Sequence, residues 1–324
     1  MERVPWVIPG PDTVPFDSYR MEGHDEWLRF RNEGIGGSDV AAIMGMSKWS
    51  TPLKVWMQKT GRLDEDISDK PNVEWGTRLE SVIRAKFAES HPEFEVSHPD
   101  LSLVSKERPW AHANLDGVIS ENGRLGILEC KTASSHVSDD WKDGVPDYYV
   151  TQVTHYMSVT GFAFAYVCVL IGGSDYREYR IERDEDDIEA VNEAVDTFWH
   201  DFVEAGQMPM VVTQDASLLH RLYDDPDGER DMTGVTEFND LCSEYEQACE
   251  DERRAKARKD ELGTRLRTMI GDSKSAGSDV YRVTWVRTRR ATFDRKGFDR
   301  DHPGMYESYT YRKPVDGGLR VRAI

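Results

Sequence analysis

The run Phe164–Ile171 (FAYVCVLI) is the feature that most limits how this chain can fold. It carries no charge and no alternation of polar and apolar side chains, which is typical of a strand buried on both faces of a sheet. Helical periodicity precedes it at about 147–160 and follows it at about 184–205. The sequence therefore predicts the α/β class, with a central mixed β-sheet flanked by helices.

Composition divides the 324 residues into four parts. Residues 1–23 are rich in proline and are expected to form an N-terminal arm, whereas 24–206 hold the mixed helices and strands of the core. Residues 207–232 contain two prolines and a glycine and are interpreted as a linker. Residues 233–324 are predicted to form a long polar helix followed by a basic, β-rich extension.

Charge is unevenly distributed along the chain. The formal net charge is −19, but residues 276–324 carry +5 and residues 1–275 carry −24. A nuclease holds its metal with carboxylates, so the acidic balance excludes no nucleic-acid partner. The four cysteines lack C-x-x-C spacing, which argues against zinc, an iron–sulfur cluster or a disulfide framework. With neither a signal peptide nor an apolar run of membrane length, a cytoplasmic protein without a membrane segment is expected.

The dipeptide Asn-Gly at 122–123 lies between two apolar stretches and is the strongest local signal for a tight β-hairpin. A two-residue loop fixes the register, and counting outward from it brings Asp116 opposite Glu129. Directly opposed residues have Cβ atoms about 4.5–5.5 Å apart. Lys131 follows Glu129 by two positions and shares its face of the strand. Three charged groups therefore converge on one spot.

Two opposed carboxylates destabilise a hairpin unless a cation lies between them. Mg²⁺ is bound by one or two carboxylates together with water and substrate phosphate. The pattern thus predicts a metal site at Asp116 and Glu129. Two alternatives remain: the register slips, or one carboxylate faces solvent beside Lys131 as an ordinary ion pair.

A second candidate site lies at Gly36–Asp39, where Ser38 or Asp39 is expected to cap a helix. The unpaired N–H groups at a helix start bind anions. Arg31 lies just before this turn, and its planar guanidinium suits phosphate. The alternative is simple capping by Ser38, with Asp39 as a cap or as a partner for Arg31.

Asp116 followed by Glu129-Cys130-Lys131 resembles the D…E-x-K signature of the PD-(D/E)xK nucleases. More closely, the chain resembles their YqaJ-like viral recombinase and lambda exonuclease branch over about 24–206. Four more segments match in order: Trp27-x-x-x-Arg31, Gly36-Gly37-Ser38-Asp39, Trp75-Gly76-x-x-x-Glu80 and Gln152-x-x-x-Tyr156. Leu115 departs from the family, which has proline before the aspartate. A literal Pro-Asp at 99–100 lacks the hairpin register.

The resemblance implies a Mg²⁺-dependent enzyme that binds one or two ions, with Mn²⁺ as a substitute. The implied metal ligands are Asp116, Glu129 and the Cys130 carbonyl, with Glu80 as an outer or weaker ligand. Lys131 would orient or polarise the attacking water, so the catalytic set is Asp116, Glu129, Lys131 and Glu80. The thiol of Cys130 points to the other face of the strand and is interpreted as core packing. For Glu80 the alternative is an inward-facing glutamate held in a salt bridge.

The resemblance also implies that Arg31, Ser38 and Gln152 hold the terminal 5′-phosphate of the strand being degraded, with Tyr156 as a further candidate. Gln152 and Tyr156 share one helix face. For Gln152 the alternative is a buried glutamine whose amide is satisfied within the core.

The implied activity is a 5′→3′ exonuclease that degrades one strand of linear double-stranded DNA and leaves 3′ single strands for phage homologous recombination. Its implied partners are double-stranded DNA ends, a single-strand-annealing recombinase and further copies of the chain in a trimeric or tetrameric ring. If the chain is phage-encoded, it acts in the host cytoplasm. The alternatives are a restriction or structure-specific endonuclease of the same fold, and a non-catalytic protein that binds DNA ends.

Basic and aromatic residues are interleaved over 281–313. This pattern suits contact with single-stranded DNA, through phosphate pairing and base stacking. Arg287, Arg289 and Arg290 are the candidate contacts. The alternative is a solvated helix followed by a small packed tail.

Overall fold

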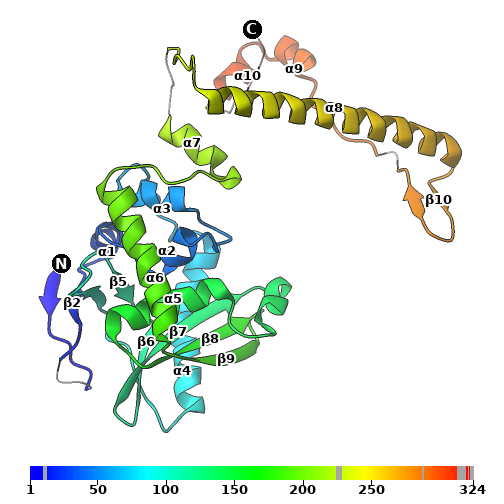
Figure 1. Cartoon of the computed structure of the whole chain (residues 1–324). Coiled ribbons are helices and arrows are strands. Elements are labelled where there is room, and N and C mark those ends of the chain that lie inside the picture. The colour runs from blue at the N-terminus through cyan, green and yellow to red at the C-terminus, as the bar shows by residue number, and fades with distance from the viewer. Residues whose placement is uncertain (10–12, 224–227, 287, 312–318, 320, 322–324) are drawn as a thin grey trace. The chain divides into compact units, whose positions relative to one another are not determined.

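The computed structural model describes residues 1–9, 13–223, 228–286, 288–311, 319 and 321. The chain divides into two compact units, Met1–Asp224 and Asp225–Ile324 (Figure 1). Their boundary falls within the range 207–232. In the described parts of the chain, no helix is both long enough and apolar enough to span a membrane.

A mixed five-stranded sheet forms the centre of the first unit. Its strands, in spatial order, are β3 (Glu95–Ser97), β6 (Gly117–Glu121), β7 (Arg124–Ala133), β8 (Phe164–Ile171) and β9 (Asp175–Glu182). β7 and β8 are parallel, and the other neighbouring pairs are antiparallel. The apolar run therefore occupies an interior strand, as the sequence predicts.

Helices cover both faces of this sheet (Figure 1). On one face lies α5 (Asp147–Thr160), whose Val153 shares a core cluster with Ile127 of β7. On the other lies α4 (Pro71–Ser90), whose Phe87 belongs to a separate cluster with the opposite side of β7. The first unit has the predicted α/β architecture, and β7 is enclosed between two helical layers.

A smaller four-stranded sheet adjoins this core. It consists of β1 (Glu2–Val4), β2 (Phe16–Arg20), β4 (Ser102–Ser105) and β5 (His112–Asn114), paired antiparallel in that order. Residues 1–23, expected to be an arm, therefore contribute two strands. The physical reason is apolar packing, because Phe16 is fully buried and its ring lies 5.0 Å from that of Trp6.

The remaining helical segments of the first unit are α1 (His24–Asn32), α2 (Gly37–Ile43), α3 (Pro52–Lys59), the 3₁₀ helix Ser135–Trp141, α6 (Glu185–Thr197), the π-helix Phe198–Glu204, the 3₁₀ helix Thr213–Asp215 and α7 (Ala216–Leu222). A third apolar cluster, which contains Ile35 and Trp56, is formed by α2, α3, α6, the π-helix and α7. The π-helix is tied to α3, because the Trp56 indole donates to the Phe202 carbonyl at 2.9 Å.

The second unit begins with the long helix α8 (Thr236–Ile270). After it come the antiparallel pair β10 (Ser275–Gly277) and β11 (Arg282–Thr284), then α9 (Arg295–Asp301) and α10 (Met305–Ser308). The extension expected to be β-rich thus contains one short hairpin and two short helices in its described part. Asp294 is the N-cap of α9, and its side chain accepts from the Gly297 N–H at 3.0 Å.

Candidate active site

The β6–β7 hairpin places two carboxylates opposite each other. The turn residues at 122–123 have φ values of 50° and 82°, as a tight hairpin turn requires, and Gly117 pairs with Leu128. Asp116 is the next residue outward from Gly117, so it lies opposite Glu129. The register predicted from the turn is confirmed.

The side chain of Asp116 accepts a hydrogen bond from the main chain of β7, where a strand partner would otherwise supply a carbonyl. Its Oδ2 accepts from the Cys130 N–H at 2.7 Å, and its main-chain carbonyl accepts from the Arg84 guanidinium at 2.5 Å. Burial raises the pKa of Asp116, although Lys131 and the Cys130 N–H oppose that change. The carboxylate is thus fixed in position and partly shielded from water.

Glu129 is only 2% exposed and has one satisfied and one unsatisfied oxygen. Its Oε1 accepts from Lys131 Nζ at 2.6 Å and from Gln152 Nε2 at 2.6 Å. Its Oε2 has no hydrogen-bond partner among the residues that the structure describes. Burial, and then the neighbouring charge of Asp116, raise the pKa of Glu129.

Lys131 is held as a cation between the carboxylates and the surface. Its Nζ also donates to Gln152 Oε1 at 3.0 Å and lies 4.7 Å from the centre of the Tyr149 ring. Burial alone would lower the pKa of Lys131, but Glu129 and Asp116 outweigh burial and raise it. The ammonium group is therefore a hydrogen-bond donor and a positive charge, not a base.

The carboxylate pair fits a divalent cation. A buried oxygen without a hydrogen is costly to leave unpartnered, and carboxylate oxygens are the ligands that Mg²⁺ prefers. The Cys130 thiol lies in the core cluster on the α4 face, as predicted. Glu80 is half-buried, and burial followed by the charge of Asp116 raises its pKa to about 7. Within the described residues, however, no three His, Cys, Asp or Glu side chains form a group that could hold a metal ion. Glu80 is therefore not assembled with the pair into a three-carboxylate site.

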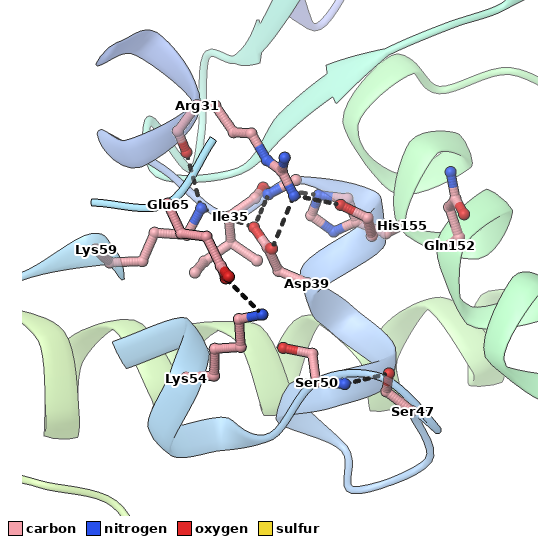
Figure 2. Close-up of polar contacts among 12 residues, drawn as sticks. Arg31, Ile35, Asp39, Ser47, Ser50, Lys54, Lys59, Glu65, Gln152 and His155 are labelled. Atoms are coloured by element: carbon pink, nitrogen blue, oxygen red, sulfur yellow. Dashed lines mark hydrogen bonds and ion pairs between the residues drawn. The ribbon is translucent and has the colours of Figure 1, made fainter. Parts of the chain in front are cut away.

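The candidate anion site at the start of α2 contains two cations and one carboxylate (Figure 2). Arg31 Nη2 donates to Ser38 Oγ at 3.3 Å and lies 3.9 Å from Asp39 Oδ1. Gly36 is the N-cap, and Asp39 accepts from its N–H at 3.1 Å. The prediction that Ser38 or Asp39 caps this helix was wrong, because a carboxylate in the third helical position can satisfy the cap N–H.

Lys59, on α3, is a residue that the sequence analysis missed. Its Nζ lies 2.7 Å from Asp39 Oδ2, and both side chains are almost fully buried. Burial would raise the pKa of Asp39, but Lys59 and then Arg31 outweigh it and lower the pKa. Lys59 thus holds the closer position beside Asp39, and Arg31 pairs with that carboxylate only at the longer distance of 3.9 Å while it donates to Ser38. No local pattern could reveal this pair, because 20 positions separate its members.

The metal-site and anion-site candidates meet where α2 crosses α5. A Cβ at Gly37 would lie 2.5 Å from the Tyr156 ring, so only glycine allows this approach. Ser38, Lys131 and Gln152 line one cleft of about 780 Å³. Both N–H groups of Gln152 are engaged, with Glu129 and with the Tyr156 hydroxyl at 3.1 Å. Gln152 therefore fixes Glu129 and Lys131 beside the cleft that Ser38 also lines.

Aromatic side chains form part of the wall of the same cleft. Trp49 and Trp75 are 64% and 60% exposed, which is unusual for indoles. The Trp49 ring lies 5.0 Å from that of Tyr148 and 6.3 Å from that of Tyr149. An aromatic surface thus extends from Lys131 to the protein exterior. Trp49 was not among the predicted residues, since the exposure of a single indole is not visible in sequence.

The tail candidates lie in the second unit. Arg289 and Arg290 are exposed, and Arg287 lies outside the described residues. Some of the neighbouring aromatic residues pack on each other: the Phe293 and Tyr306 rings lie 6.4 Å apart, and Arg295 stacks over Tyr306 at 3.9 Å.

A mixed sheet whose central hairpin carries an aspartate opposite an E-x-K strand defines a core of the PD-(D/E)xK class. Residues 26–163 match the YqaJ-like viral recombinase domain. Over 292 residues the chain is 31% identical to the uncharacterized protein YqaJ of Bacillus subtilis (strain 168), which covers 87% of this chain and 89% of that protein. The chain therefore belongs to the YqaJ-like viral recombinase family.

Solved structures with a related arrangement include two exonucleases. The alkaline exonuclease LHK-Exo of Laribacter hongkongensis is 20% identical with a TM-score of 0.45, over 57% of this chain and 94% of that one. A phage-related exonuclease of Haemophilus somnus 129PT is 12% identical with a TM-score of 0.38, over 56% of this chain and 99% of that one.

Proposed function

We propose that this chain is a Mg²⁺-dependent exonuclease that degrades one strand of linear double-stranded DNA in the 5′→3′ direction. The observation that carries the proposal is the largely buried set of Asp116, Glu129 and Lys131, which adjoins a cleft that is also lined by Ser38, the hydrogen-bond partner of Arg31. The exposed indoles of that cleft support a nucleic-acid substrate, since aromatic rings stack on unpaired bases.

Asp116, Glu129 Oε2 and the Cys130 carbonyl would hold Mg²⁺ or Mn²⁺, with Glu80 as an outer ligand. When bound, the cation polarises the scissile phosphate and offsets its negative charge. Lys131 donates a hydrogen bond to the attacking water and contributes a positive charge where charge develops. Gln152 keeps Glu129 and Lys131 in a fixed relative position, because its side-chain amide forms a hydrogen bond with each of them.

The Arg31–Ser38 site would bind the terminal 5′-phosphate and so set the polarity. Arg31 supplies a planar fork of donors, and Ser38 supplies a hydroxyl and lies in the first turn of α2. Gln152, which lines the cleft, and Tyr156, whose hydroxyl accepts from the Gln152 amide, would complete this site. The product would be a 3′ single strand, which suits a single-strand-annealing recombinase as partner. A trimeric or tetrameric ring is part of the same proposal.

The test is digestion of end-labelled linear duplex, with and without a 5′-phosphate, in Mg²⁺ and in chelator. We expect nucleotide release only in Mg²⁺, and no cleavage of closed circular duplex. Cut circles would indicate an endonuclease, and binding of ends without any release would indicate a non-catalytic protein.

Polarity is tested by Arg31→Ala on both kinds of end. A charge-assisted hydrogen bond contributes roughly 1.5–3 kcal/mol, so digestion of 5′-phosphorylated ends should slow at least about tenfold. The effect on 5′-hydroxyl ends should be much smaller, because the partner group is already missing. If the effects of the substitution and of phosphate removal simply add, Arg31 does not contact the phosphate.

A further inference from the structure

A seam of side chains runs along α8 with alternating spacings of three and four residues. Its positions are Phe238, Leu241, Tyr245, Ala248, Glu252, Ala255, Lys259, Leu262, Leu266 and Met269. Eight of the ten are apolar. Repetition at this spacing over more than four heptads is the a/d pattern of a coiled coil.

The large members of this seam are exposed within the described structure. Leu241 is 59% exposed and Met269 is 83% exposed, and Phe238 and Leu266 are both at 44%. Helices in proteins gain most of their stability from packing an apolar face, and a contiguous exposed apolar surface marks an interaction site. The seam therefore requires a partner with a matching face.

Charge along α8 is segregated into two halves. Residues 236–252 carry seven acidic and no basic side chains, and residues 253–270 carry seven basic and two acidic ones. The helix dipole favours this polarity only within the first and last turns. Among the described residues, the ion pairs within α8 are confined to 250–261. Each half is therefore complementary to the opposite half of a second, reversed α8.

We propose that α8 pairs with α8 of a second copy of this chain as an antiparallel two-stranded coiled coil. One register matches the whole seam: Phe238 opposite Met269, Leu241 opposite Leu266, Tyr245 opposite Leu262, Ala248 opposite Lys259 and Glu252 opposite Ala255. The large apolar residues then meet at both ends. Glu252 and Lys259 of opposite helices lie in adjacent layers near the centre. Polar residues at such core positions select register and orientation.

The residues flanking the seam favour the antiparallel orientation. When one helix is reversed, the same edge of each helix faces its counterpart on the other. Glu244 then lies next to Arg265 of the second copy, and Asp251 lies next to Arg258. Symmetry forms each of these ion pairs twice. A parallel pair would place Arg258 beside Gly263 and would align the two acidic halves, which repel.

The proposal is tested by disulfide trapping in the full-length protein, and the readout does not depend on nuclease activity. In a background in which Cys242 and Cys249 are serine, Leu241→Cys and Leu266→Cys are made as separate variants. We expect covalent dimers when the two variants are co-expressed and oxidised, and none when either is expressed alone. Cross-linking of each variant by itself would show a parallel pair, and no cross-linking in any combination would show that α8 binds something else. Either result overturns the proposal.

Ser243 and Thr264 provide the matched control. They lie on the outer face of α8 at equivalent positions in the two halves, so co-expressed Ser243→Cys and Thr264→Cys chains should not cross-link. A second measurement is sedimentation of full-length Leu241→Glu/Leu266→Glu. We expect a smaller assembly than wild type, whereas Thr264→Glu should sediment as wild type does. An unchanged assembly in the double variant would contradict the proposed interface.

Discussion

Lys59→Met should test two roles of the buried Lys59–Asp39 pair at the start of α2. The pair is expected to stabilise the fold, and it is expected to keep Arg31 beside Ser38. The substitution keeps a chain of similar length and removes the charge that lies 2.7 Å from Asp39. Asp39 then keeps its bond from the Gly36 N–H, but its nearest cation is Arg31 at 3.9 Å. Breaking a buried pair by removing one partner costs about 3–5 kcal/mol, a large part of the roughly 5–15 kcal/mol that stabilises a domain.

Lys54→Met is the matched control on the same helix. Lys54 pairs with Glu65 at 2.8 Å (Figure 2), but both side chains are 24% exposed. Water screens that pair, so its loss should cost no more than about 1 kcal/mol. Urea unfolding of the two variants measures the difference directly. Equal losses of unfolding free energy would mean that burial of the Lys59–Asp39 pair does not matter.

Lys59→Met should also alter substrate recognition. Without Lys59, Arg31 is the nearest cation to Asp39 among the described residues, and their 3.9 Å ion pair should shorten. Arg31 would then leave Ser38, and the preference for 5′-phosphorylated over 5′-hydroxyl ends should fall by roughly tenfold or more, the value of one charge-assisted contact. Lys54→Met should keep that preference. If Lys59→Met is destabilised yet discriminates between the ends as wild type does, Arg31 does not depend on Lys59.

Three further predictions concern the carboxylates, the lysine and the buried histidines. Asp116→Asn and Glu129→Gln should each abolish Mg²⁺-dependent cleavage while the protein stays folded, because each amide keeps an acceptor oxygen and the remaining carboxylate still stabilises the Lys131 cation; near wild-type rates would contradict the metal role. Lys131→Ala should bind duplex ends in a filter assay but fail in single-turnover cleavage, and the reverse outcome would make Lys131 a phosphate contact. Burial holds the pKa of both His112 and His155 down to about 4. The unfolded chain, with histidine pKa near 6.5, takes up protons first as pH falls, so folding stability should decline from about pH 6.5 to about pH 4. The free energy of unfolding should be lower at pH 5 than at pH 7 by about 2 kcal/mol per histidine, and His155→Gln should reduce that difference.

The sequence by itself determined the hairpin and the strand on which the proposed catalytic residues stand. The turn at 122–123 fixes its own backbone angles and hence the register, so the opposition of Asp116 and Glu129 is a local property. The apolar run of β8 has only one favourable environment, between two helical layers. Both features depend on residues close together in the chain, and both were predictable.

Tertiary structure decided how the site is completed. Three features arise where elements distant in sequence pack together. They are the Lys59–Asp39 pair, the two hydrogen bonds that join Gln152 to Glu129 and to Lys131, and the exposure of Trp49. The N-cap of α2 is Gly36 rather than Ser38 or Asp39, because the Asp39 side chain accepts from the Gly36 N–H while it pairs with Lys59 of α3. Contacts of this kind depend on the relative positions of whole elements, which many distant apolar contacts set together. A short motif carries no information about them.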